Sequence, residues 1–179
     1  MTHVSLVDPA TADGDRRALL DEITGAFGAT PAMFRAVANS PAALRSMWGS
    51  FGALGGGVLP ARLTEQIAVA VADRNRCAYC LAAHTALGRK AGASAEELAA
   101  AQAGDSDDPR TAAVLGFALA LVDERGDAPA SAIEELRSHG VTDEELVEIV
   151  AHVALNLFTN YVNVALDVPV DFPSVALTA

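Results

Sequence analysis

The sequence predicts an all-α protein built as a single helical domain, on three observations. Its 179 residues form one domain that is large enough to bury a core without disulfide or metal staples. Half of the residues are hydrophobic, and alanine is the most frequent of these, whereas aromatic residues make up only 5% of the whole chain. This composition favours closely packed helices over a sheet. Capping sequences recur along the chain, each followed by apolar residues at helical spacing.

The first half of the chain predicts an arm and five helices. Residues 1–14 are mostly polar and form the predicted N-terminal arm, after which Asp13 or Asp15 can cap the first helix. Proline suits a first helical turn because that turn leaves its N–H groups unpaired, and Pro31, Pro41 and Pro60 are placed accordingly. The predicted helices cover residues 16–27, 31–38, 41–54, 60–73 and 76–90.

The second half predicts four helices and a tail. Ser94, Ser131 and Thr142 each open a capping box with a glutamate three residues later. Asp108 precedes Pro109 in the pattern of an N-cap followed by a first-turn proline. The predicted helices cover residues 95–103, 109–124, 132–139 and 143–166, so the helical domain spans 15–166 and the proline-containing tail spans 167–179.

Charge and hydropathy restrict the partners and the location. The formal net charge is −11, so clustered Lys and Arg are lacking and we expect no nucleic-acid partner. Residues 1–15 lack the basic leader and apolar core of a signal peptide, and the longest apolar run, 147–166, is interrupted by Glu148 and His152. We therefore expect a cytoplasmic protein with no membrane partner, where a lone cysteine pair is redox-active or metal-binding rather than structural.

The stretch richest in reactive side chains runs from Arg76 to His84 and holds both cysteines. On a helix, at about 100° per residue, Cys77, Cys80 and His84 fall within a sector of roughly 60°. Asn75 is the expected N-cap of this helix. Both thiols then lie in its first turns, where free backbone N–H groups and the helix dipole favour a thiolate.

This arrangement is typical of a thiol peroxidase or a thiol–disulfide relay. A cysteine near a helix N-terminus becomes nucleophilic when an adjacent imidazole can take its proton, and Cys80 with His84 meets that description. Cys77 is close enough in the chain to condense with an oxidised Cys80. The resulting disulfide could be reopened by a dithiol reductant.

Glu65 extends the pattern to E-x11-C-x2-C-x3-H, with Cys77, Cys80 and His84 as its other members. This signature resembles that of the carboxymuconolactone decarboxylase superfamily, in its alkylhydroperoxidase D-like branch. Residues 151–161 resemble the C-terminal helix of the same family. Together the two regions cover about half of the chain, and the cysteine segment is the more diagnostic of them.

The resemblance implies an all-helical homo-oligomer, a dimer, trimer or hexamer, and we predict neither cofactor nor metal. Cys80 would form a sulfenic acid, Cys77 would protonate the leaving group and then resolve, and Glu65 with His84 would relay the proton. The implied partners are a hydroperoxide substrate and a dithiol reductant of thioredoxin-like or lipoyl type. Alkylhydroperoxidase D itself has a histidine before its second cysteine, where this chain has Tyr79.

Three alternatives use the same residues. Lactone decarboxylases of this superfamily generally do not rely on a cysteine pair, so the pair favours redox work over decarboxylation. A non-catalytic oligomer could use the pair only as a redox switch. A zinc site is the third alternative, with Cys77, Cys80 and His84 as ligands and His152 or Glu65 completing the set.

A polar stripe about 80° wide runs along the last predicted helix and consists of His152, Asn156, Asn160 and Asn163. Such a stripe is either a buried polar seam between subunits or the lining of a reaction pocket. Tyr79, His152 and Asn156 are the predicted substrate or pocket residues.

Overall fold

The computed structural model describes residues 2–178, and every regular element within them is helical. A 3-10 turn, η1 (Pro9–Thr11), precedes the α-helices. These are α1 (Gly14–Phe27), α2 (Ala32–Val37), α3 (Pro41–Leu54), α4 (Ala61–Arg74), α5 (Ala78–Lys90), α6 (Ala95–Gln102), α7 (Pro109–Asp123), α8 (Ala130–Ser138) and α9 (Asp143–Ala165). None of these helices is long and apolar enough to cross a membrane. The all-α prediction is confirmed, and the helix ends agree with the predicted ones to about two residues.

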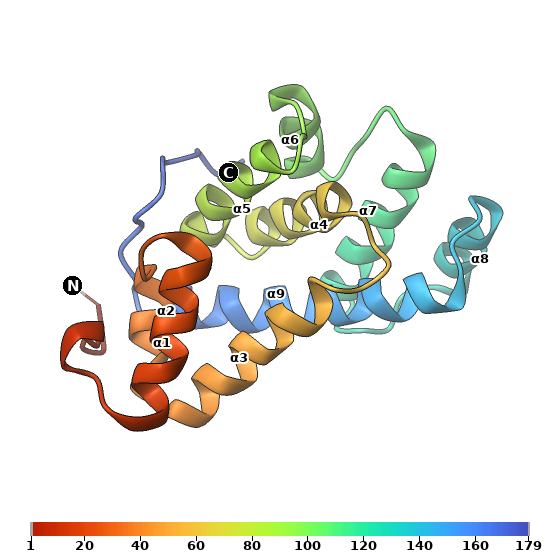
Figure 1. The fold of residues 1–179 in the computed structure, drawn as a ribbon. Coiled ribbons are helices and arrows are strands. Elements are labelled where there is room, and N and C mark those ends of the chain that lie inside the picture. Colours follow the sequence, from red (N-terminus) through yellow and green to blue (C-terminus); the bar gives the residue numbers. More distant parts are fainter. Residues whose placement is uncertain (1, 179) are drawn as a thin grey trace.

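Helix α4 is the centre of the domain and packs against α5, α6, α7 and α9 (Figure 1). Every residue from Gln66 to Ala72 is buried, so the C-terminal half of α4 is covered on all sides. Three of these residues are alanines, at positions 68, 70 and 72, and their small side chains let neighbouring helix backbones approach closely. The helix that carries Glu65 is therefore fixed by its neighbours along most of its length.

The junction of α4 and α5 differs from the prediction. Asn75 is the C-cap of α4, and Cys77 is the N-cap of α5. Between them Arg76 has a left-handed backbone with φ of 56°, which turns the chain sharply enough for the Cys77 N–H to bond the Ala72 carbonyl at 2.9 Å. The prediction that Asn75 caps α5 is wrong, because α4 continues to Arg74 with Asn75 as its C-cap, and α5 begins two residues later than predicted.

The capping box predicted at Ser131 is also absent. Helix α8 begins at Ala130 after Pro129, and no side chain caps it, so Ser131 lies inside the first turn. Pro129 supplies the extended backbone that starts the helix two residues earlier than a serine cap would. By contrast, the boxes at Ser94 and Thr142 are both formed, each with its reciprocal glutamate bond.

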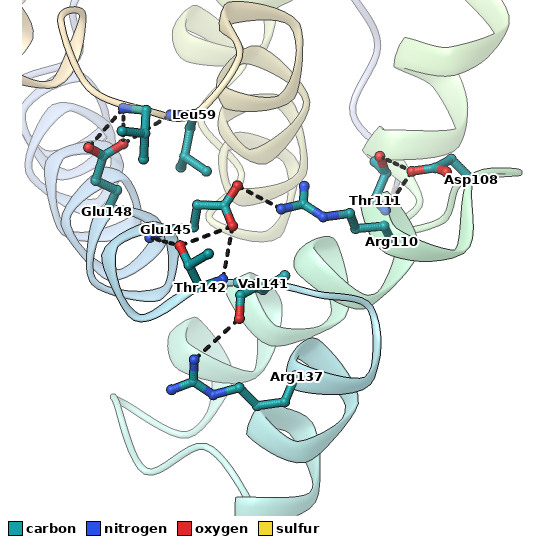
Figure 2. Close-up of polar contacts among 10 residues, drawn as sticks. Leu59, Asp108, Arg110, Thr111, Arg137, Val141, Thr142, Glu145 and Glu148 are labelled. Atoms are coloured by element: carbon teal, nitrogen blue, oxygen red, sulfur yellow. Dashed lines mark hydrogen bonds and ion pairs between the residues drawn. The ribbon is translucent and has the colours of Figure 1, made fainter.

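Two carboxylates near the start of α9, Glu145 and Glu148, connect this helix to α7 and to the α3–α4 loop (Figure 2). Glu145 accepts hydrogen bonds from the Thr142 N–H at 2.9 Å and from the Arg110 guanidinium of α7 at 2.7 Å. The Thr142 N–H is the main reason that the pKa of Glu145 lies below its usual value, and Arg110 adds to the effect. Glu148 accepts from the backbone N–H groups of Val58 and Leu59, so it holds the α3–α4 loop on α9.

Both chain ends lie on the body of the domain. The Thr2 hydroxyl and the His3 N–H bond the Leu166 carbonyl, at 2.9 and 2.8 Å. The C-terminal tail leaves α9 and ends beside α5 and α6 (Figure 1), where the Gln102 amide donates to the Ala176 carbonyl at 2.8 Å. The arm of residues 1–14 and the tail of 167–179 stay predictions as separate units, and their outermost residues, Met1 and Ala179, lie outside the described residues.

Thr142→Ala should destabilise the protein by about 1 kcal/mol, because it removes the side-chain cap of the longest helix. Urea unfolding followed by circular dichroism measures this. Ser131→Ala is the matched control, since Ser131 follows the same sequence pattern but caps nothing. Its unfolding free energy should stay within about 0.5 kcal/mol of the parent. Equal losses in the two variants would contradict the assigned caps.

Candidate active site

The two cysteines lie at the first turn of α5 and are joined by a disulfide. Their Cα atoms are 5.3 Å apart, and the Cys77 sulfur also accepts a hydrogen bond from the Cys80 N–H at 3.2 Å. Cys77 is therefore the side-chain cap of α5, at the positive end of the helix dipole. Both residues are enclosed, with 0% of Cys77 and 2% of Cys80 exposed.

His84 lies one turn beyond Cys80 and pairs with Glu65 across the α4–α5 contact. Its Nδ1 is 2.8 Å from Glu65 Oε2, with 13% of the histidine side chain and 20% of the glutamate side chain exposed. Gly88 lies one turn further along α5, close to both α4 and α6. A Cβ there would lie 3.4 Å from Glu65 Cβ, an ordinary contact, and 2.7 Å from Leu98 Cδ2, so the leucine side chain would have to move.

The polar stripe of α9 is buried inside this one chain. Asn163 donates from Nδ2 to the Cys80 sulfur at 3.2 Å. Asn160 accepts from the Asn75 amide at 2.9 Å, and Asn156 donates to the His152 carbonyl at 2.9 Å. The three asparagines are 0 to 5% exposed, so they form a seam within the subunit, and it reaches the sulfur of Cys80.

A largely apolar pocket opens onto Cys80, and we call it the Cys80 pocket. It measures about 410 Å³ including its open mouth. Its lining residues are Phe27, Pro31, Met33, Phe34, Phe51, Tyr79, Cys80, Ala83, His84, Leu87, Thr159, Asn163 and Phe172. Cys77 is not among them, so a molecule in this pocket meets Cys80 and the imidazole of His84. No Lys or Arg lines it, which disfavours an anionic occupant.

A second pocket lies on the other side of the His84–Glu65 pair, with a volume of about 480 Å³. We call it the His152 pocket; besides those three residues, its lining includes Asn156 and Thr159. Burial is the main cause that lowers the pKa of His152, and the nearby His84 lowers it further against the opposing effect of Glu148 and Glu65. Among the described residues, the buried Nε2 of His152 has no hydrogen-bond partner.

Tyr79 lies at the wall of the Cys80 pocket and its hydroxyl is already bonded. That hydroxyl accepts from the Met33 N–H at 3.3 Å, and its ring meets Phe172 edge-on with centroids 5.7 Å apart. Burial raises the pKa of Tyr79, and the neighbouring carboxylate of Asp171 raises it further. The tyrosine is therefore held neutral and does not exchange a proton near neutral pH.

The structure brings together most of the residues predicted for the site. Cys80, His84 and Tyr79 share the Cys80 pocket, while Glu65, His152 and Asn156 line the pocket behind it. The fourfold zinc set has no counterpart: among residues 2–178, no group of three His, Cys, Asp or Glu side chains is placed to hold a metal ion.

Asn163 and Phe172 line the Cys80 pocket but were not among the predicted site residues. Asn163 follows His152, Asn156 and Asn160 at helical spacing, but the spacing does not indicate that Cys80 is its partner. No sequence pattern pointed to Phe172. It lies in a tail without periodicity, and its position depends on where the tail crosses the domain.

Comparison with known proteins gives a family and a shared fold. Residues 41–124 match the carboxymuconolactone decarboxylase family. The chain is similar to the alkylhydroperoxidase AhpD core of an uncharacterized peroxidase-related protein from Ralstonia eutropha JMP134, at 25% identity, with 95% of this chain and 92% of that chain covered and a TM-score of 0.84. No curated protein sequence matches it significantly.

Two further solved structures share the fold alone. A peroxidase-related protein from Silicibacter sp. TM1040 is 24% identical, with 98% of this chain and 92% of that chain covered and a TM-score of 0.80. The debrominase Bmp8, solved in complex with 2,3,4-tribromopyrrole, is 20% identical, with 96% and 92% covered and a TM-score of 0.82.

The matched segment contains Glu65, Cys77, Cys80 and His84, the residues that form the cysteine site. The helical fold around that segment is the fold of the alkylhydroperoxidase core. Residues 41–124 therefore match the carboxymuconolactone decarboxylase family, and the chain has the fold of the alkylhydroperoxidase core.

Proposed function

We propose that the protein is a thiol-dependent peroxidase that reduces apolar hydroperoxides through Cys80. One observation carries the proposal: Cys80 lines the Cys80 pocket, whose lining does not include Cys77, and the same pocket is lined by His84, which is paired with Glu65. A nucleophile, a base and a group that orients the base are the minimum for covalent catalysis by a thiol.

The first half of the cycle oxidises Cys80. His84, oriented by Glu65, takes the thiol proton, and the resulting thiolate attacks one oxygen of the hydroperoxide. The O–O bond breaks, Cys80 keeps one oxygen as a sulfenic acid, and the leaving alkoxide takes a proton from the Cys77 thiol and departs as an alcohol. Cys77 is left as a thiolate at the N-terminus of α5, where the Cys80 N–H already points at its sulfur.

The second half forms and reopens the disulfide. The Cys77 thiolate attacks the Cys80 sulfur, and the hydroxide that leaves takes the proton held on His84 and becomes water. A dithiol then supplies two electrons and two protons to restore both thiols and is itself oxidised to a disulfide. Thioredoxin-like and lipoyl-type dithiols are the reductants to be tested.

The lining of the pocket favours this reaction over decarboxylation of a lactone acid. A carboxylate in an apolar pocket needs a cation or several donors to offset its desolvation. Neither the Cys80 pocket nor the His152 pocket is lined by Lys or Arg. The fold by itself does not select the reaction, since one structure that shares it is a debrominase.

Assembly into a homo-oligomer is part of the same proposal. Helix α9 presents four apolar side chains to solvent at helical spacing: Val147, Val150, Tyr161 and Val164 are 68, 43, 62 and 53% exposed. A row of this kind on one helix is typical of a surface that contacts another chain. The expected partner is a second copy of the protein, and the number of subunits follows from light scattering.

Cys80→Ser should abolish turnover, because an alcohol cannot replace the thiolate near neutral pH. The measurement is hydroperoxide consumption with excess dithiol, for a panel of organic hydroperoxides. In the parent, titration of free thiols before and after one equivalent of hydroperoxide should show the loss of two thiols per chain. Full activity in the variant would exclude the peroxidase. A single stoichiometric oxidation without sustained turnover would favour the redox switch.

Glu65 and His84 should act as one unit. Glu65→Gln and His84→Gln should each lower kcat/KM by about 10²-fold or more, since general-base catalysis contributes on that scale. The double variant should be no slower than the worse single variant, because each change already disables the relay. Losses that multiply in the double variant would show that the two residues work independently.

Asn163→Ala should slow the reaction of reduced Cys80 with iodoacetamide about tenfold at neutral pH. The side-chain N–H that stabilises the thiolate is lost, and a hydrogen bond to a charged group contributes about 1.5–3 kcal/mol. Asn160→Ala is the matched control, since Asn160 lies on the same helix but bonds Asn75 instead of the sulfur. Equal rates for Asn163→Ala and the parent would remove Asn163 from the activation of Cys80.

A further inference from the structure

The C-terminal tail contributes one wall residue, Phe172, to the Cys80 pocket. It leaves α9 with the Val168 N–H bonded to the Asn163 carbonyl at 3.0 Å. Its far end is held by the side chain of Asp73, which accepts from the Thr178 N–H at 3.0 Å and also from the Thr178 hydroxyl. Both ends of the tail are therefore attached to helices that carry site residues, and the segment between them crosses from α9 to α4.

Phe172 is the tail residue that reaches the pocket. Its ring is half-buried, lines the Cys80 pocket and meets the ring of Tyr79 edge-on, at an interplanar angle of 85°. Tyr79, Phe172 and Cys80 all line the same pocket, so the aromatic contact forms part of the wall around the Cys80 side chain. Apart from Pro31, which immediately precedes α2, the other lining residues belong to packed helices, whereas Phe172 comes from a segment without regular structure.

Tyr79 and Asp171 fasten this part of the tail. The Asp171 carboxylate accepts from the Ala32 N–H at 2.7 Å, and it lies near enough to Tyr79 to raise the pKa of the tyrosine hydroxyl. That hydroxyl accepts from the Met33 N–H. Asp171 and Tyr79 are thus both bonded to the start of α2, so the residue before Phe172 is fixed there.

We infer that Phe172 is a specificity-determining residue that limits the size of the molecule able to reach Cys80, and that Tyr79 and Asp171 are positioning residues that hold it there. The inference deepens the proposed peroxidase and rests on it for its biological meaning. Cys80 is 2% exposed and its partner Cys77 is 0% exposed, and the Cys80 pocket is the opening that leads to the Cys80 side chain. A hydroperoxide and a reductant that use this opening enter a pocket that Phe172 lines.

The test uses thiol labelling, which needs no hydroperoxide turnover. The full chain carrying Cys77→Ser has one thiol, at Cys80. A methanethiosulfonate transfers its thioalkyl group to that thiolate and releases methanesulfinate, with a balanced exchange of one S–S bond for another. Rate constants for the methyl and benzyl reagents are measured by intact mass, and their ratio reports how well the pocket admits a bulky group.

Phe172→Ala should raise the benzyl rate relative to the methyl rate by about tenfold, a change typical of removing one wall of an apolar pocket. Phe172→Trp should shift the ratio in the opposite direction, and it serves if the alanine variant does not fold. Val170→Ala is the matched control, because Val170 is an exposed apolar residue of the same tail that does not line the pocket. Its ratio should equal that of the parent.

Two results would overturn the inference. If both reagents accelerate by the same factor in Phe172→Ala, the ring affects the reactivity of the thiolate and not its access. If neither rate changes, the tail does not stand in the way of Cys80. Asp171→Asn should shift the ratio in the same direction as Phe172→Ala but less, and an unchanged ratio there would remove the positioning role. A lack of peroxidase turnover in the parent, with the labelling ratios as expected, would refute the proposed function and leave the size limit in place.

Discussion

The tight turn between α4 and α5 is the constraint on which the site depends. Arg76 adopts a left-handed conformation and the Cys77 N–H returns to the Ala72 carbonyl, so α5 begins at once and at a fixed angle to α4. Within the first turn of α5 the Cys77 sulfur accepts from the N–H of Cys80, and the angle between the helices directs His84 toward Glu65 one turn later. A longer connection would leave the two cysteines in place along the chain but would not fix the imidazole against its carboxylate.

Buried polar atoms without a hydrogen-bond partner lower the stability of the folded protein, and most of those found among the described residues lie on α9. Within residues 2–178, buried atoms without a hydrogen-bond partner include Nε2 of His152, Nδ2 of Asn160 and Oδ1 of Asn163. All three belong to the stripe of α9 that faces the cysteine region. Buried polar atoms are normally paired, so their concentration beside a reactive sulfur is better explained by function than by stability, since an apolar α9 would pack without this penalty.

The sequence predicted the helices with ends within about two residues of those observed, because helix formation is set largely by local chemistry. It also named Cys77, Cys80, His84 and Glu65 as candidate site residues, and the structure places these side chains together. Thr142 and Ser94 cap as their boxes predict, whereas Ser131 does not, since Pro129 starts α8 first. The cap of α5 could not be predicted, because Cys77 replaces Asn75 only through the tertiary fit of the α4–α5 turn. The position of Phe172 could not be predicted for the same reason. Which residue of an irregular tail lines a pocket depends on contacts between residues far apart in the sequence.

Tyr79 shows how a single position can separate two tasks. A histidine before the second cysteine could exchange a proton at neutral pH, but a buried tyrosine beside the Asp171 carboxylate stays protonated and neutral. In the proposed peroxidase, proton transfer therefore belongs to His84 and Glu65, on the side of α5 that faces α4. In the inferred size limit, Tyr79 instead holds Phe172 at the pocket. Under these two proposals, proton transfer and access to Cys80 depend on different side chains of α5, His84 and Tyr79, so a substitution can alter one without the other.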